Sequence, residues 1–246
     1  MNAGNTMPVL LLLLFSFALS AGAGMIVLII RLVRARPAVA EPELSLFPLY
    51  ACERTCYSRR PNCWLAVKSG NLHAVQSALG LHHAKACSWM EGLEEKLFIA
   101  PPVKGWILVI GSGLPDPSED VDVCFRFVLE LSRKLGQVQF FSASRILHHH
   151  AWVQANSGRV IRAYAWAGKT LWQQGLRTRA ERELDLRCFD YAESAESNSS
   201  SQMDAAAANV EKVPLLAARW SLDPAGIDER FLESEPGIAG ESSRRY

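Results

Sequence analysis

The sequence predicts an α+β domain, with a mainly antiparallel sheet and flanking helices on one face, preceded by one transmembrane helix. Three observations favour this class. Strand-like runs follow one another in hairpin order between helical patterns, and no βαβ unit repeats along the chain. A long uncharged apolar run stands at the N-terminus. The composition, 49% hydrophobic and 21% charged, is that of a globular protein and excludes a disordered or multi-span membrane chain.

The N-terminal apolar run covers residues 7–30 and contains no charged side chain. About 20 apolar residues cross the hydrocarbon core, so the run is long enough to span a bilayer. A cleaved signal peptide is the alternative, because small residues stand at 18–24. However, no Lys or Arg precedes the run, and its apolar character continues through residues 25–30. The pattern therefore favours an anchor, and cleavage would instead give a secreted or periplasmic protein.

The flanking charges predict the orientation of this anchor. Arg31, Arg34 and Arg36 follow the span, and only the α-amino group precedes it. Because positive flanks stay on the cytoplasmic side, we expect a single-pass protein of the inner membrane with a cytoplasmic C-terminal domain. The cysteines would then be reduced. The expected parts are an anchor with its basic flank (1–36), a Pro-rich spacer (37–50), one α+β domain (51–235) with a flexible loop (191–203), and a disordered tail (236–246).

The first half of the domain reads as two helices followed by two strands. Residues 64–68 predict a short helix, 69–71 a turn, and the following residues a second helix through Leu79. Residues 97–100 and 105–111 predict strands on either side of a Pro-Pro turn. The second strand is apolar on both faces and is therefore expected at the centre of the sheet.

The second half contains an amphipathic helix and a hairpin. Ser118 is the expected N-cap of a helix whose buried face runs through 121–135 and which ends at Gly136. Residues 138–142 predict a strand, the turn Asn-Ser-Gly at 156–158 predicts a hairpin between 151–155 and 159–166, and 171–175 predict an edge strand. Asp204 is expected to cap an Ala-rich helix toward Trp220, which Pro214 kinks or splits, and Pro224 to begin a short last helix.

The hairpin also supplies the candidate partner-binding residues. Alternation places Arg162, Tyr164 and Trp166 on one face with Val160, while Ala163 and Ala165 face the 121–135 helix. Trp152 and Gln154 are the expected cross-strand neighbours. An arginine is hard to bury without a charged partner, so the face is expected to be partly accessible. The predicted binding surface consists of Trp152, Arg162, Tyr164 and Trp166, and a helix-covered core is the alternative.

Four short motifs occur between residues 101 and 224. They are Pro101-Pro102-Val103-x-Gly105-Trp106, Gly113-Leu-Pro115, Gly158-x-Val160-x-Arg162-x-Tyr164 and Trp220-Ser-x-Asp223-Pro224. In this order they resemble a set of uncharacterised bacterial proteins, over residues 64–224. The resemblance implies that this stretch is a single domain, and it brings no activity and no catalytic residues.

Candidate metal and catalytic residues are few. Cys52, Cys56 and Cys63 could hold zinc, but the paired Cys-x2-Cys spacing is missing, so ordinary reduced thiols are favoured. The histidines at 148–150 lack a visible third ligand. Gly111-Ser-Gly113 does not complete a phosphate-binding motif. An acidic cluster precedes and opens the 121–135 helix, where it suits either Mg²⁺ or, more simply, the positive end of the helix: Asp116, Glu119, Asp120 and Asp122.

The function that this pattern favours is a membrane-tethered cytosolic module that binds a protein partner without catalysis. A hydrolase-type enzyme, using a Cys–His or metal site that spacing does not reveal, is the alternative. Because the net charge is only +1, no nucleic acid is expected as a partner. No cofactor is expected either. The expected partners are the lipid bilayer, through residues 7–30, and a protein.

Overall fold

The computed structural model describes residues 61–191, 200–227 and 235–242. The chain divides into two compact units, Met1–Leu49 and Tyr50–Tyr246, and every described residue belongs to the second. The predicted anchor and spacer lie outside the described residues. Within the described ranges, none of the helices combines the length and the apolar character that crossing a membrane requires.

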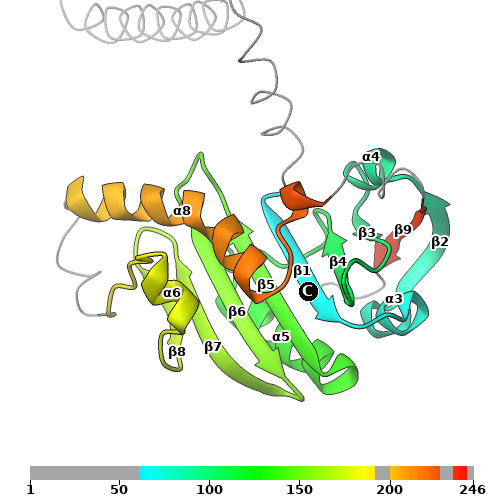
Figure 1. Ribbon diagram of the computed structural model, residues 1–246, viewed down its shortest axis with the longest axis horizontal. Coiled ribbons are helices and arrows are strands. Elements are labelled where there is room, and N and C mark those ends of the chain that lie inside the picture. Colours follow the sequence, from blue (N-terminus) through cyan, green and yellow to red (C-terminus); the bar gives the residue numbers. More distant parts are fainter. Residues whose placement is uncertain (1–60, 192–199, 228–234, 243–246) are drawn as a thin grey trace, which may run out of the picture. The chain divides into compact units, whose positions relative to one another are not determined.

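The described residues form one nine-stranded sheet in which every neighbouring pair of strands is antiparallel, so the α+β class with a mainly antiparallel sheet is confirmed (Figure 1). The strand order is β2-β9-β3-β4-β1-β5-β6-β7-β8. The strands are β1 (Cys63–Lys68), β2 (Leu81–Cys87), β3 (Leu97–Ile99), β4 (Trp106–Ile110), β5 (Gln137–Ala143), β6 (His150–Asn156), β7 (Arg159–Trp166), β8 (Thr170–Gln174) and β9 (Gly237–Ser242).

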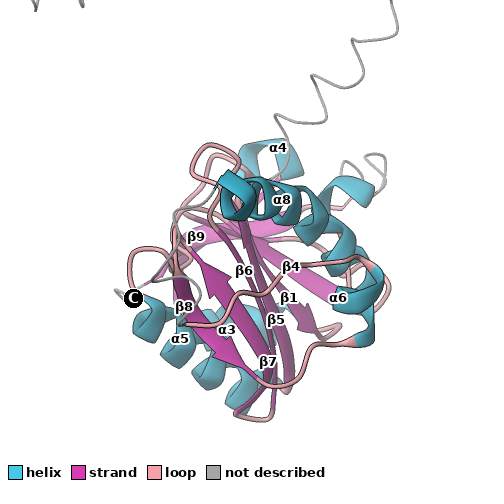
Figure 2. Cartoon of the chain, turned by 90° about the vertical axis from the view of Figure 1, so that its left-hand side faces the viewer, coloured by secondary structure: helices cyan, strands magenta, loops and turns pink. Residues whose placement is uncertain are grey.

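Helices cover both faces of this sheet, which corrects the expectation of helices on one face (Figures 1 and 2). One face packs against α3 (Leu72–Leu79) and α5 (Val121–Leu135). The other packs against α4 (Trp89–Gly92), α6 (Arg179–Glu183) and α8 (Ser200–Trp220), and a 3-10 helix η1 (Pro224–Gly226) follows. Two buried faces explain why β4 is apolar at every position.

Residues 64–68 belong to the central strand β1, between β4 and β5, so the short helix predicted there is wrong. Leu65 and Val67 enter the core on the α5 side, while Trp64 and Ala66 enter the core on the α8 side. A strand buried on both faces shows no alternation of polar and apolar residues, and a short apolar run of this kind is ambiguous from sequence. The second predicted helix is confirmed as α3.

The amphipathic helix is confirmed as α5, but Asp120 rather than Ser118 is its N-cap. The Asp120 carboxylate accepts hydrogen bonds from the backbone N–H groups of Asp122 and Val123, both at 3.0 Å. Ser118 instead donates its hydroxyl to Asp116 at 2.8 Å. The buried face of α5 lies in one cluster with Ala163 and Ala165, as expected.

The hairpin of β6 and β7 is confirmed, with Trp152 opposite Tyr164 and Gln154 opposite Arg162. The register then shifts, so that Ala155 lies opposite Val160 and Ile161 is an extra residue in β7. A bulge of this kind reverses the alternation. Val160 therefore packs on the α5 side and Ile161 is 55% exposed, so placing Val160 on the face of Arg162 was wrong. The predicted edge strand is confirmed as β8.

The C-terminal residues are part of the sheet rather than a disordered tail over 237–242, where β9 pairs with both β2 and β3. Glycine permits this insertion: a Cβ at Gly237 would lie 2.3 Å from the Phe98 ring, and one at Gly240 would lie 2.8 Å from the His82 carbonyl oxygen. The Ala-rich helix α8 also departs from prediction, since it begins at Ser200, upstream of the expected cap, and runs unsplit through Pro214.

Candidate functional site

The four residues predicted to bind a partner lie in the core. Trp152, Arg162, Tyr164 and Trp166 are 0%, 1%, 0% and 2% exposed, so the expectation of an accessible face is wrong and the helix-covered alternative is right. Their side of the sheet is covered by α6, by α8 and by the segment between these helices that includes Leu186.

Glu181, on α6, is the charged partner that allows Arg162 to be buried. Its carboxylate is fully buried and accepts from the guanidinium through Nη2 at 2.8 Å and Nε at 2.9 Å. It also accepts from Trp152 Nε1 at 2.8 Å and from the backbone N–H of Thr178 at 2.6 Å. The remaining N–H groups of Arg162 reach backbone carbonyls, including that of Ala163 at 2.9 Å, and the Cys188 sulfur. Burial raises the pKa of Glu181, but the hydrogen bonds and charge of Arg162 outweigh burial and hold it below its usual value.

His150 lies at the centre of a second cluster of buried polar groups. Its ring stacks on Trp152 and Trp166, with centroids 5.7 and 5.5 Å away. His150 Nε2 lies 3.0 Å from the Asn209 amide nitrogen, which donates to it, and Nδ1 lies 3.1 Å from the His148 carbonyl oxygen. Because burial disfavours the charged ring, the pKa of His150 falls to about 4. The same Asn209 side chain bonds both the N–H and the carbonyl of Arg187, so the predicted site residues and their neighbours hold the α6–α8 segment on the sheet.

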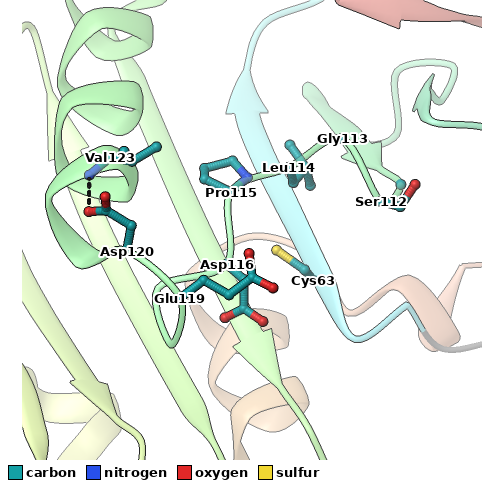
Figure 3. A pocket seen from close by; sticks show the side chains of 10 residues that line it. Cys63, Ser112, Gly113, Leu114, Pro115, Asp116, Glu119, Asp120 and Val123 are labelled. Atoms are coloured by element: carbon teal, nitrogen blue, oxygen red, sulfur yellow. Dashed lines mark hydrogen bonds between the residues drawn. The ribbon is translucent and has the colours of Figure 1, made fainter. Parts of the chain in front are cut away.

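A pocket of about 660 Å³ opens elsewhere, between the start of β1, the loop after β4 and the first turn of α5 (Figure 3). Figure 3 shows Asp116 and Glu119 pointing into the same space beside the thiol of Cys63. Among the described residues that line it there are three carboxylates and no basic side chain. The lining residues are Cys63, Gly111, Ser112, Gly113, Leu114, Pro115, Asp116, Glu119, Asp120 and Val123.

Local chemistry explains the shape of this pocket. The chain turns sharply after β4 because Gly111 adopts a φ of 129° and lies against the Lys96 carbonyl, which a Cβ would approach to 2.2 Å. The same carbonyl accepts from Gly113 N–H at 2.7 Å. Asp116 then accepts from Ser118 N–H at 2.8 Å, and Asp120 caps α5. The Glu119 carboxylate makes no hydrogen bond or ion pair within the described part of the chain, so it is available to a ligand.

A small recess adjoins the pocket and shares Asp116 with it. Trp166 and His149 also line this recess. Neither Trp166 Nε1 nor His149 Nδ1 has a hydrogen-bond partner among the residues that the structure describes, although both atoms are buried. Unpaired buried donors are rare in proteins, and the indole N–H of Trp166 is one such donor among the described residues.

The described thiols are not activated. Burial, with Cys124 and Asp116 nearby, raises the pKa of Cys63 well above its usual value, and burial raises the pKa of Cys188 to about 11. Across 61–191, 200–227 and 235–242, no three or more His, Cys, Asp or Glu residues are grouped to hold a metal ion. Cys52 and Cys56 lie outside these ranges, so whether Cys52, Cys56 and Cys63 are ordinary thiols, as favoured above, or zinc ligands stays a matter of prediction.

Sequence reasoning found the carboxylates of the pocket but not the pocket itself. The acidic cluster was interpreted as charge suited to the start of a helix, which holds for Asp120, the N-cap. Cys63 precedes the cluster by some 50 residues and meets it only through the pairing of β1 with β4. The one local signal was Gly111-x-Gly113 directly after an apolar strand.

Comparison of the chain with models of protein families, with curated proteins and with solved structures gave no match.

Proposed function

We propose that this protein is a membrane-tethered, non-catalytic binding module, which recognises a cationic group of a protein partner in the acidic pocket on the cytosolic side. The observation that carries the proposal is that the carboxylates of Asp116 and Glu119 both line an open pocket of about 660 Å³, and that Glu119 has no partner among the residues that the structure describes. Pockets of roughly 300–1,000 Å³ are typical of ligand sites.

The lining suits a lysine or arginine side chain. Carboxylates accept charge-assisted hydrogen bonds from ammonium and guanidinium groups. Leu114, Pro115 and Val123 offer apolar surface to the methylene stem of such a side chain.

The tether is the apolar run 7–30, and the basic flank that follows it supports a cytosolic domain. A reporter fused after Tyr246 should be active only in its cytosolic form. Mature protein that begins near residue 23 would contradict the tether. The hydrolase alternative gains no support from the described cysteines, because the raised pKa values of Cys63, Cys124 and Cys188 keep these thiols protonated.

The test uses the full chain in lipid nanodiscs and short labelled peptides that differ only in carrying Lys, Arg or Gln. We expect the basic peptides to bind in a salt-dependent manner and Glu119→Gln to weaken their binding about tenfold, because a hydrogen bond to a charged group contributes roughly 1.5 kcal/mol. Asp204→Asn, on the exposed surface of α8, removes the same charge away from the pocket and should leave affinity unchanged. Equal binding of basic and Gln peptides would rule out the proposal.

A further inference from the structure

The loop between β5 and β6 presents two large aliphatic side chains to solvent. Ile146 is 91% exposed and Leu147 is 57% exposed. The loop is nevertheless held in place, because Ser144 N–H donates to the His149 carbonyl at 2.8 Å and Arg145 pairs with Glu211 of α8 at 2.6 Å. The exposed apolar side chains therefore stand on an ordered loop.

This loop lies at the place where the chain enters the domain. The backbone N–H of Ala143, the last residue of β5, donates to the carbonyl of Asn62 at 2.7 Å. The next residue, Cys63, is the register partner of Ser142. Figure 1 shows the start of β1 and the β5–β6 loop at the same, upper end of the sheet. The apolar run 7–30 thus precedes, by residues 31–60, the point from which the loop projects.

We propose that Ile146 and Leu147 form a second membrane contact, inserting into the interface of the bilayer in which residues 7–30 are anchored. The proposal rests on the tether of the proposed function. Aliphatic side chains flanked by polar ones bind weakly and reversibly at a bilayer interface. The 30 residues from 31 to 60 reach at most about 100 Å, so the anchor confines the domain near the surface and a weak contact suffices.

The contact would orient the binding pocket. Cys63 and the carboxylates after β4 lie at the same end of the sheet as the loop, since Trp64 is the register partner of both Ile110 and Phe141. Insertion of the loop turns this end toward the bilayer. The cytoplasmic flanks of other membrane proteins, rich in Lys and Arg, stand at that same surface.

The experiment places a photo-crosslinking amino acid at position 146 of the full chain in phosphatidylcholine–phosphatidylglycerol vesicles and measures lipid adducts by mass spectrometry. Leu176 is the matched control, because it is also 91% exposed but follows β8 at the opposite end of the sheet: Gln174 pairs with Ala163, whereas Thr170 pairs with Trp166. We expect at least fivefold more lipid adduct from position 146 than from position 176.

Three results separate the ways in which the idea can fail. Equal lipid adducts from positions 146 and 176 would overturn the loop contact while leaving the tether intact. Adducts from position 146 to protein, including a second copy of the chain, would also overturn it. Extraction of the unmodified chain from membranes by alkaline carbonate would show that residues 7–30 do not anchor it. Such a result would contradict both this inference and the membrane part of the proposed function.

Discussion

Replacing Glu181 by alanine removes the acceptor at the centre of the buried polar network. Arg162, which is 1% exposed, would keep its charge without a carboxylate partner, and Trp152 Nε1 would lose the one acceptor that the described residues give it. Breaking a buried ion pair by removing one side costs about 3–5 kcal/mol. For a chain of this size, about 2–4 °C of melting temperature correspond to 1 kcal/mol, so we expect a drop of roughly 6–20 °C.

Glu183→Ala is the matched control for this prediction, because Glu183 lies on the same helix and pairs with Arg179 and Arg219, both at 2.6 Å. Its side chain is 44% exposed, and exposed ion pairs add little to stability because solvent and salt screen them. Thermal melting followed by circular dichroism measures both variants. The double variant Arg162→Met with Glu181→Leu should melt above Glu181→Ala, since no charge is then buried alone.

Equal, small losses in Glu181→Ala and Glu183→Ala would refute the reasoning, because they would mean that solvent reaches Arg162. The hairpin face would then not belong to the core, and the surface formed by Trp152 and Tyr164 would again be a candidate binding surface.

Two further predictions concern the buried histidine and the last strand. The pKa of His150 is about 4 in the folded chain and about 6.5 when unfolded, so between these values only the unfolded state binds the proton. The free energy of unfolding should therefore decrease by about 3 kcal/mol as the pH falls from 6.5 to 4. If the free energy of unfolding, measured by chemical denaturation, had the same pH dependence in wild type and His150→Gln over that range, the prediction would be wrong. Truncation after residue 236 removes β9 and leaves β2 and β3 without their shared neighbour, so cooperative melting should be lost, whereas truncation after Ser242 should preserve it.

Features determined by neighbouring residues could be predicted from the sequence. The hairpin of β6 and β7 was predicted correctly because Asn-Ser-Gly at 156–158 is typical of a turn and β-favouring residues stand on both sides of it. Helix α5 was correct because its apolar residues recur at helical spacing. The bulge at Ile161 was not predicted, since a single extra residue leaves no mark on composition.

Features that depend on distant residues could not be predicted. The burial of Arg162 depends on Glu181, which lies in a charged segment without apolar periodicity, and nothing local marks it as a partner. The segment Gly237–Ser242 resembles a Gly-rich tail in sequence, since glycine has a low strand propensity. Its two glycines are instead required by the close approach of Phe98 and His82, which only the folded structure reveals. The acidic pocket could not be predicted either, because Cys63 reaches the carboxylates after β4 only through the pairing of β1 with β4.

The position of β9 has a consequence for the order in which the protein assembles. Strands β5 to β8 pair with their neighbours in sequence and can form as soon as they leave the ribosome. By contrast, Leu81 pairs with Ser242 and Leu97 with Gly240, so β2 and β3 are synthesised long before the strand that lies between them. Until β9 has been synthesised, β3 presents an open edge and β2 has no neighbour, and in this interval the unpaired strands are most exposed to wrong pairing.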